Sequence, residues 1–371
     1  MSSLNMSNNR KEKIKMSSVI VGFGNTGNNI VCDIAVTSGF EDSRLFSIDS
    51  VASSVSINDT GKVKTIPIIS DDKSGSGRDR NRGKAMYKFH EKNGSFDELY
   101  LTCDESSSPV FVITSAAGGT GSGAVVPFCE YLIKNDIHVI PVIICPNEKD
   151  PDAYHMNASD LLLELDSVGV STYATFINPD NSNYTSVNKE VVEAIKVMLG
   201  KYYGNTNKDS IDDSDLETVL NWPGRLLAVA VNDGNNESVG KNLLRKVFWG
   251  HQRGWDPNDK NLGTLITAAS LKSVYADLDY DDVFGPIYDK IPRVYDRYKH
   301  IDNSTGHEAT IIVAGLPRPN IKKIDGDFNE ASSIGSGIQK STRPAFMKKK
   351  QAKFEAPTSG TNNNIAQFNI K

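Results

Sequence analysis

Two hydrophobic patterns alternate along the first half of this chain. One is a short, mostly apolar run of the length expected for a buried strand, and it occurs at residues 16–21, 44–48, 110–114, 138–145 and 173–177. The other places apolar residues three and four positions apart, which is the period of a helix with one buried face, and it follows most of these runs. Strands that alternate with helices in this way predict an α/β fold.

A longer helical pattern separates this half from a second group of apolar runs. It starts near Val187, and a stripe of apolar residues marks its buried face: Val191, Val192, Ile195, Met198 and Leu199. After it, strands are expected at residues 225–231, 262–269 and 309–315, and helices at 238–249 and 280–287. These elements predict a smaller α/β unit packed against the long helix.

Composition limits where the protein works. With 371 residues, 38% of them apolar and 23% charged, the chain can build one large or two medium cores. No apolar run approaches the roughly 20 residues of a membrane span, and residues 1–15 are polar and basic, so we expect a cytoplasmic protein without a transmembrane segment. Four cysteines without Cys-x-x-Cys spacing predict free thiols in a reducing compartment and no structural metal: Cys32, Cys103, Cys129 and Cys145.

The net charge of −5 conceals an asymmetry along the chain. From Arg318 onward there are ten Lys and Arg residues against four Asp and Glu residues, which leaves the preceding part at −11. This last segment is also poor in large apolar residues and rich in Ser, Gly, Asn and Lys. It is therefore expected to be a disordered basic tail.

A glycine-rich run follows the strand at residues 110–114 and leads into a helix. This run, the glycine loop, consists of Ala117, Gly118, Gly119, Thr120, Gly121, Ser122 and Gly123. Glycine permits left-handed backbone and a close approach to a ligand, while the two hydroxyls and the free N–H groups at a helix start can bind an anion. A phosphate chain is the expected ligand. A flexible linker is the weaker alternative, because linkers do not usually lie between a buried strand and an amphipathic helix.

Two further loops point to the same chemistry. The first loop, after the strand at 16–21, carries Gly22, Gly24, Asn25, Thr26, Gly27 and Asn29, and these glycines alone would fit a dinucleotide-binding fold equally well. The arginine loop, residues 75–83, places Arg78, Arg80 and Arg82 among three glycines. Its arginines could bind phosphate in bidentate fashion, form a solvated face or contact another subunit. Between these loops, Asp49 ends a strand, where it could hold a ribose or a metal-bound water, or be an ordinary turn residue.

The glycine loop strongly resembles the signature loop of the tubulin/FtsZ superfamily of filament-forming GTPases, with Ala117 in place of the first glycine. The resemblance covers about residues 16–319 and rests on five loops in the family's order. It implies a Rossmann-like, parallel-sheet GTP-binding domain at 16–186, a long central helix at 187–209 and a smaller α/β activation domain at 210–319. These would lie between a flexible extension at 1–15 and the disordered basic tail at 320–371.

The same resemblance assigns a site for GTP or GDP, with Mg²⁺ held through the phosphates and not by protein side chains. The residues that it assigns to the nucleotide are Gly22, Gly24, Asn25, Thr26, Asn29, Asp49, Gly75, Gly77, Gly83, Ala117, Gly118, Gly119, Thr120, Gly121, Ser122, Gly123, Asp150, Asn178 and Asn188. The arginine loop would sense the γ-phosphate. We also expect Gly121→Val to abolish nucleotide binding by steric exclusion, without unfolding the protein.

The resemblance also assigns some of these residues to the ribose and to the guanine base. Asp150, together with Asp152, would face the ribose. Asn29 and Asn188 would reach the guanine base, as would one member of the turn Asn178, Asp180 and Asn181. An amide both donates and accepts, which suits the O6 and N1/N2 edge of guanine.

Residues 210–220 resemble the catalytic loop of the family, with Asp212 and Asp215 at its two acidic positions and Ser210 in place of the usual asparagine. The resemblance implies that each subunit places these carboxylates over the nucleotide of its neighbour, so that the active site is completed in a head-to-tail filament. By position alone, Asp212 or Asp213 could instead be the N-cap of the next helix.

The biological role is less sharply indicated. Loop lengths and the run at residues 155–158 favour the plasmid- and phage-encoded bacterial tubulins, and hence filaments that position DNA in the cytoplasm of a bacterial or phage-infected cell. Residues 343–352 in the tail resemble the peptide by which FtsZ holds its adaptors, which implies an adaptor protein, a DNA-bound adaptor or a membrane surface as partner. The alternatives are therefore an FtsZ-like division protein and a GTP-binding regulator that does not polymerise.

Overall fold

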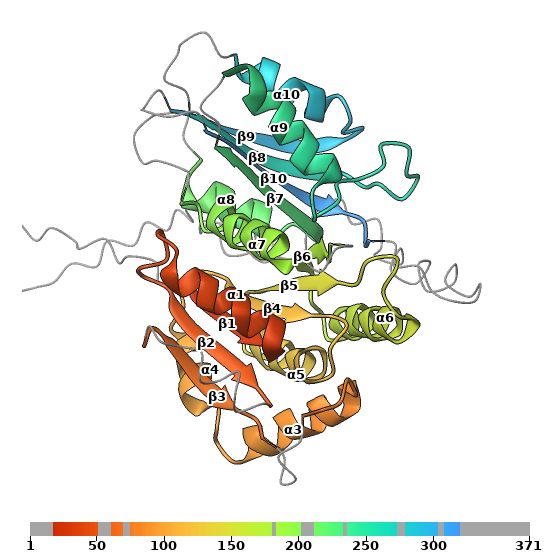
Figure 1. The fold of residues 1–371 in the computed structure, drawn as a ribbon. Coiled ribbons are helices and arrows are strands. Elements are labelled where there is room, and N and C mark those ends of the chain that lie inside the picture. The colour runs from red at the N-terminus through yellow and green to blue at the C-terminus, as the bar shows by residue number, and fades with distance from the viewer. Residues whose placement is uncertain are drawn as a thin grey trace, which may run out of the picture. The chain divides into compact units, whose positions relative to one another are not determined.

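The computed structural model describes residues 18–50, 61–69, 75–179, 183–201, 211–232, 236–272, 279–302 and 308–319 (Figure 1). Within these residues, ten strands form one mixed sheet in the order β3-β2-β1-β4-β5-β6-β7-β10-β8-β9, with helices packed on it. The α/β prediction is confirmed. The predicted extension at 1–15, the tail at 320–371 and its motif at 343–352 lie outside the described residues.

The first six strands are parallel and form a doubly wound sheet. They are β1 (Val19–Phe23), β2 (Arg44–Asp49), β3 (Val63–Pro67), β4 (Val110–Ser115), β5 (Val139–Cys145) and β6 (Thr172–Ile177). Every residue of β1 and β5 is buried, as expected for strands covered on both faces. The strand order reverses between β1 and β4, which is the position where such sheets usually bind ligands.

Helices cover both faces of this half of the sheet. The helices before β7 are α1 (Gly24–Val36), α3 (Arg80–Lys92), α4 (Asp97–Asp104), α5 (Thr120–Lys134), α6 (Asp152–Ser167), α7 (Tyr184–Met198) and α8 (Asp213–Leu220). On one face, α5 packs between α3 and α6, and its Val125 and Phe128 join Val21 and Phe23 of β1 in a single apolar core. On the other face, α1 lies against β1, β2 and β4 and contacts α7 (Figure 1).

The sheet continues without a break into the second half. β7 (Gly224–Asn232) pairs with β6 in parallel, β10 (Glu308–Leu316) runs antiparallel between β7 and β8 (Leu265–Lys272), and β9 (Val294–Asp302) forms the edge. Helices α9 (Asn236–Trp249) and α10 (Tyr280–Tyr288) cover one face. This half has an apolar core of its own, which includes Leu227, Leu243 and Phe284. The predicted domain boundaries stay a prediction, because the two cores share one sheet.

Several elements differ from the sequence-based expectations. β3, α4 and β9 were not predicted, and both strands lie at edges of the sheet, where alternating polar residues weaken the apolar signal. α3 begins at Arg80, before the predicted Lys84, because the Asp79 carboxylate caps it by accepting from the N–H groups of Asn81 and Arg82. α6 begins at Asp152 and not at Ala158, with an acid in its first turn.

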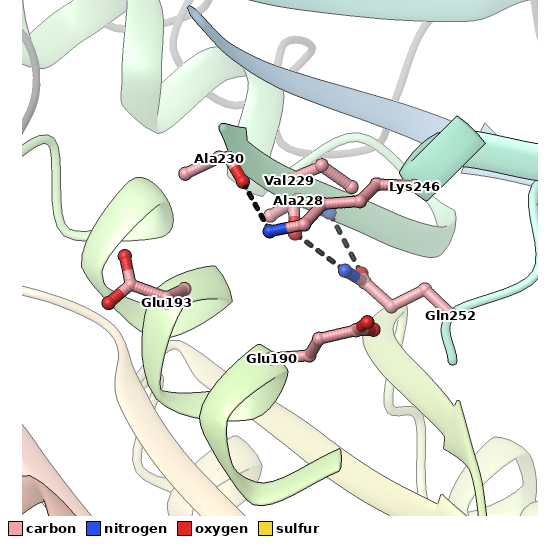
Figure 2. Close-up of a pocket in the computed structure, with 7 residues that line it drawn as sticks. All are labelled: Glu190, Glu193, Ala228, Val229, Ala230, Lys246 and Gln252. Atoms are coloured by element: carbon pink, nitrogen blue, oxygen red, sulfur yellow. Dashed lines mark hydrogen bonds between the residues drawn. The ribbon is translucent and has the colours of Figure 1, made fainter. Parts of the chain in front are cut away.

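Polar groups close the gap where β6 and β7 diverge. The two strands pair only from Thr172↔Gly224 to Ala174↔Leu226, and beyond that the side chain of Gln252 takes the place of a neighbouring strand (Figure 2). Its Nε2 donates to the carbonyl oxygen of Ala228 at 2.6 Å, and its Oε1 accepts from the N–H of Ala228 at 2.9 Å. A cavity of about 10 Å³ remains beside it, room for a single water at most.

A buried arginine fixes the same region. Arg225 is 3% exposed and donates to the carbonyl oxygens of Gln252, Arg253, Gly254 and Pro317. Burial lowers the pKa of this guanidinium to about 10. The arginine therefore joins the loop after α9 to the start of β7 and to the chain that leaves β10.

Candidate functional site

A pocket of about 390 Å³ lies at the carboxyl end of the sheet, between the loops that follow β1 and β4. It is lined by Asn25, Thr26, Asn29, Arg78, Ser115, Ala117, Gly118, Tyr154, Asn178, Tyr184, Val187 and Asn188. Seven of these were assigned to the nucleotide from the sequence, and they come from α1, the glycine loop, the end of β6 and α7. The fold therefore brings distant segments together at the point where the strand order reverses.

Two helix starts provide the anion-binding part of the pocket. α1 begins at Gly24, directly after β1, and α5 begins at Thr120, two residues after Gly118, which lines the pocket. Neither helix start is capped by a side chain, and neither has an acidic residue in its first turn. The N–H groups there have no partner within their own helices, and the helix dipoles add positive potential. Phosphate oxygens would accept hydrogen bonds from these N–H groups, and their negative charge would be stabilised by the helix dipoles.

The glycines of the glycine loop have different tasks. A Cβ on Gly118 would meet only the carbonyl oxygen of Ser115, at 3.9 Å, so this residue is open toward the pocket. A Cβ on Gly121 would lie 2.5 Å from Thr114 Oγ1 and 2.6 Å from the carbonyl oxygen of Phe23. The expectation that Gly121→Val excludes the ligand without unfolding is therefore wrong, because the side chain would collide with β1 and β4. Gly119 and Gly123 are likewise packed against backbone of the arginine loop and α3.

The hydroxyls beside this loop bond to the protein. Thr120 Oγ1 lies 2.8 Å from Ser50 Oγ and donates to Ser76 Oγ at 2.9 Å, and all three residues are buried. The Ser122 hydroxyl donates to the carbonyl oxygen of Gly118. Asp49, 3% exposed, accepts from the N–H of Ser50 at 2.6 Å. These groups shape the loops from behind and do not line the pocket.

The arginine loop reaches the pocket through a single side chain. Arg78 lines it, whereas Gly75, Gly77 and Gly83 do not. Gly77 has φ 62, which only glycine adopts easily, and Gly83 packs its α-carbon against the carbonyl oxygen of Gly119.

The other two arginines of this loop lie in α3. Arg80 is 8% exposed and donates to Glu164 Oε1 at 3.2 Å and to the carbonyl oxygen of Ser122 at 3.3 Å. It therefore joins α3 to α5 and α6. Neither Arg80 nor Arg82 is among the residues that line the pocket.

The opposite part of the pocket is lined by amides and an aromatic ring. Asn29 of α1, Asn178 after β6 and Asn188 of α7 surround it, and Asn188 Nδ2 donates to Asp33 Oδ2 at 3.3 Å. Tyr184, at the start of α7, was not predicted; its ring is half exposed beside these amides and offers a flat apolar face. An aromatic residue four positions before Asn188 is the signal that could have identified it.

Some assigned residues lie elsewhere. Asp150 closes a turn, where its carboxylate accepts from the N–H of Asn147 at 2.8 Å, and it does not line the pocket. Asp152 is in the first turn of α6 and does not line it either. Asp180 and Asn181 lie outside the described residues. Gly22 packs its α-carbon on Gly27, beneath the first turn of α1.

Asn157 of α6 holds two of the loops together. Its Nδ2 donates to the carbonyl oxygens of Arg78 and Ala117, each at 3.2 Å. One turn earlier, Tyr154 lines the pocket, and the Arg78 guanidinium lies 4.5 Å from its ring centre. Sequence reasoning missed both roles, because it placed these residues in a loop; their spacing of three within a helix is what directs them to one face.

The two acids assigned to catalysis form a helix cap. The N–H of Asp215 donates to Asp212 Oδ1 at 2.8 Å, and the N–H of Asp212 donates to Asp215 Oδ2 at 3.3 Å. The structure therefore has the capping arrangement that was the alternative interpretation for Asp212. Partial burial raises the pKa of the Asp215 carboxyl, and repulsion from Asp212 and Asp296 adds to this. Ser210 lies outside the described residues.

α8, which carries these acids at its start, lies toward the end of the sheet opposite to the carboxyl ends of the parallel strands (Figure 1). The chain leaving α8 meets the first residue of β6, where Thr172 Oγ1 donates to the carbonyl oxygen of Trp222, whereas Asn178 follows the last residue of β6. α7 begins at the pocket and its 15 residues span about 22 Å. Asp212 and Asp215 are therefore remote from the pocket of their own chain.

The cysteines are free, as predicted, and burial raises the thiol pKa of both Cys103 and Cys145 to about 12. Within the described residues, no group of three or more His, Cys, Asp or Glu side chains could hold a metal ion. The described helices include none that is both long and apolar enough to cross a membrane.

Comparison with known proteins agrees with this geometry. Residues 79–204 match the family described as Tubulin like, and no curated protein sequence matches the chain significantly. A solved structure of CetZ2 from Haloferax volcanii, a GTPγS-bound protofilament, is similar with a TM-score of 0.63 and 16% identity over 91% of this chain and 100% of that one.

Two other classes of the superfamily are about equally similar. Clostridium botulinum phage c-st TubZ has a TM-score of 0.60 and 15% identity over 81% of this chain and 92% of its own. An FtsZ dimer of M. jannaschii has a TM-score of 0.63 and 17% identity over 85% and 96%. The chain therefore has the fold of the tubulin/FtsZ superfamily, and residues 79–204 match its tubulin-like family model.

Proposed function

We propose that this protein binds GTP in the pocket at the carboxyl end of the sheet, hydrolyses it and polymerises head to tail. The observation that carries the proposal is the convergence of two uncapped helix starts and three asparagine amides on one pocket of about 390 Å³. Helix starts suit a phosphate chain, and amides suit a base edge. A nucleotide carries a phosphate chain at one end and a base at the other.

The polarity of the pocket sets the orientation of the nucleotide. The phosphates would lie along the first loop and the glycine loop, at Asn25, Thr26 and Gly118. The guanine would lie between Asn29, Asn178 and Asn188, with the ring of Tyr184 available for stacking. When bound, Mg²⁺ would neutralise phosphate charge and would be held through the phosphates.

Catalysis would require two subunits. Asp212 and Asp215 are remote from the pocket of their own chain, and Asp212 is exposed. A second subunit whose pocket docks against the start of α8 could therefore receive these carboxylates at the terminal phosphate of its own nucleotide. Contacts between unlike surfaces of this kind repeat into an open filament. Each carboxylate would orient the attacking water for the nucleotide of the adjacent subunit.

For the biological role, we propose the positioning or segregation of plasmid or phage DNA. The loop lengths, the run at residues 155–158 and the likeness to a phage TubZ support it. The comparable likeness to FtsZ favours a second candidate, a division protein. Fluorescence microscopy of the tagged protein separates the two, since one predicts filaments associated with DNA and the other a ring at midcell.

The test of the proposal is negative-stain electron microscopy with light scattering, using GTP, GDP and GTPγS. We expect filaments with GTP that disappear as it is consumed, persistent filaments with GTPγS, and none with GDP. In parallel, competition binding should show that GTP displaces a fluorescent guanine nucleotide far better than ATP. Binding without scattering would leave a non-polymerising regulator, and absence of guanine nucleotide binding would overturn the proposal.

A further inference from the structure

His251 lies in the loop after α9 and does not line the pocket, yet it contacts two of the elements that do. Every residue that lines the pocket precedes β7, so His251 belongs to the other half of the sheet. We propose that His251 is a positioning residue for base recognition. It would hold the end of β6 and the start of α7, which present Asn178, Tyr184 and Asn188 to the pocket. This inference rests on the proposed function.

One side of His251 bonds to the last residue of β6. The N–H of Ile177 donates to the carbonyl oxygen of His251 at 2.7 Å, and His251 Nδ1 lies 2.9 Å from the carbonyl oxygen of Ile177. Because a carbonyl only accepts, this ring nitrogen carries a proton and donates. The N–H of Asn178, the next residue, donates to the carbonyl oxygen of Cys145 at 2.9 Å. The backbone that carries the Asn178 amide is therefore held by β5 and by His251.

The other ring nitrogen of His251 reaches the first turn of α7. Its Nε2 lies 3.1 Å from Ser186 Oγ, which lies 3.0 Å from the carbonyl oxygen of Asn183, the N-cap residue of α7. Among the described residues, no side chain caps this helix start. The imidazole therefore joins the end of β6 to the start of α7, two residues beyond Tyr184.

The backbone of His251 is itself fixed. Its N–H donates to Glu190 Oε2 at 2.9 Å, and Glu190 points from α7 toward the loop that carries Gln252 (Figure 2). Gln252 is 3% exposed, bonds to Ala228 through both ends of its side-chain amide, and accepts at its carbonyl oxygen from Arg225. Groups that recognise a ligand must be held within about 0.5 Å of their productive positions. A ring mounted on a fixed backbone can provide that support.

His90 is a matched histidine elsewhere in the protein. Its Nε2 lies 3.0 Å from the carbonyl oxygen of Ile69, and its Nδ1 lies 3.4 Å from Ser95 Oγ. It therefore has the same two kinds of partner as His251, but none of these three residues is among those that line the pocket. A difference between the two histidines in nucleotide binding would report the location of His251 and not the general loss of an imidazole.

The experiment measures the affinities for GTP, GDP and ATP by competition at protein concentrations too low for assembly. We expect His251→Ala to weaken binding of both guanine nucleotides about 5- to 10-fold and of ATP less than about twofold, because ATP makes no use of amides placed for guanine. His251→Asn should recover part of the loss, since its amide can donate to the Ile177 carbonyl. His90→Ala should match the wild type for all three nucleotides.

Ser186→Ala tests the contact with α7 separately. It should cause a smaller loss that is also confined to the guanine nucleotides. The double variant with His251→Ala should lose less than about twofold beyond His251→Ala alone, because the two side chains share one interaction.

Thermal unfolding of each variant accompanies the titrations. The inference would be overturned if folded His251→Ala bound guanine nucleotides as the wild type does, if ATP affinity fell as much as GTP affinity, or if His90→Ala caused the same loss. Should His251→Ala not fold, Ser186→Ala decides between the same outcomes. A wild-type protein that binds no nucleotide, or binds GTP no better than ATP, would instead contradict the proposed function itself.

Discussion

The two ends of the sheet present polar groups in opposite states. At the carboxyl end, uncapped helix starts and asparagine amides surround an open pocket. At the amino end, Asp212 and Asp215 are bonded to each other's backbone in a helix cap. The carboxyl end has backbone N–H donors at helix starts that no side chain caps. The amino end has carboxylates that already accept hydrogen bonds from backbone N–H groups. The difference supports the proposal that the pocket binds its ligand within one subunit, whereas the acids act on a molecule that docks against them.

The largest expected effect is on hydrolysis. Asp212→Asn and Asp215→Asn should each lower the GTPase rate by about 100-fold or more, because a neutral amide is a poor group for activating water. Asparagine is as good an N-cap as aspartate, so α8 should keep its start. GTP affinity should stay within about twofold of wild type, since the acids are remote from the pocket of their own chain. Phosphate release and nucleotide titration measure the two quantities.

Mixed assembly tests whether this site is shared. Copolymers of wild type with Asp215→Asn should lose more activity than their wild-type fraction predicts, because each variant subunit silences the nucleotide of its neighbour. If wild-type subunits too dilute to assemble hydrolyse GTP at the polymer rate, the two ends do not cooperate between subunits.

The second prediction adds one methyl group at two glycines of the same loop. Gly118→Ala should weaken nucleotide binding about 10- to 100-fold with little change in stability, because its Cβ would enter the pocket and not the protein. Gly121→Ala should lower the free energy of unfolding by about 1–3 kcal/mol, because its Cβ would collide with Thr114 and Phe23. Nucleotide titration and urea unfolding distinguish the two effects, and the reverse assignment would contradict the geometry.

A third, smaller effect concerns the base. Asn188→Ala should reduce the preference for GTP over ATP by about tenfold, the loss expected when one hydrogen bond to the base is removed. Asp33→Ala is the control: it removes the present partner of Asn188 but no residue that lines the pocket. Competition binding gives the preference directly. Equal binding of GTP and ATP by the wild type would show that the amides do not read guanine.

The smallest effect is on stability at the amino end. The pKa of Asp215 is raised in the folded state, so the folded protein binds this proton more tightly than the unfolded chain does. The associated stabilisation is present at acid pH and is lost as the pH rises through the folded pKa. The unfolding temperature of Asp215→Asn, relative to wild type, should therefore rise as the pH rises from below the ordinary aspartate pKa through the raised folded pKa, and should then stay constant. Asp213→Asn, an exposed position in the same first turn of α8, is the matched control.

Much of the fold could be predicted because its strongest signals are local. The continuous apolar strands β1, β4, β5, β6 and β7 and the periodic stripe of α7 each report burial within one short segment. The glycine loop and the first loop were also evident, since a strand, a turn of glycines and a helix follow one another directly. The edge strands β3 and β9 were not predicted, because many of their residues are exposed and polar, which weakens the apolar signal.

Tertiary structure alone decided which residues share a surface. The spacing of the glycines in the sequence did not reveal that Gly118 faces the pocket while Gly121 packs on β1. Gly121 packs against the carbonyl group of Phe23, which lies about a hundred residues earlier in the chain. Nor did the sequence reveal that Asn157 joins two loops, or that α7 separates the acids of α8 from the pocket. A sequence pattern records how one segment alternates between water and core, whereas a site depends on the packing of segments far apart in the chain.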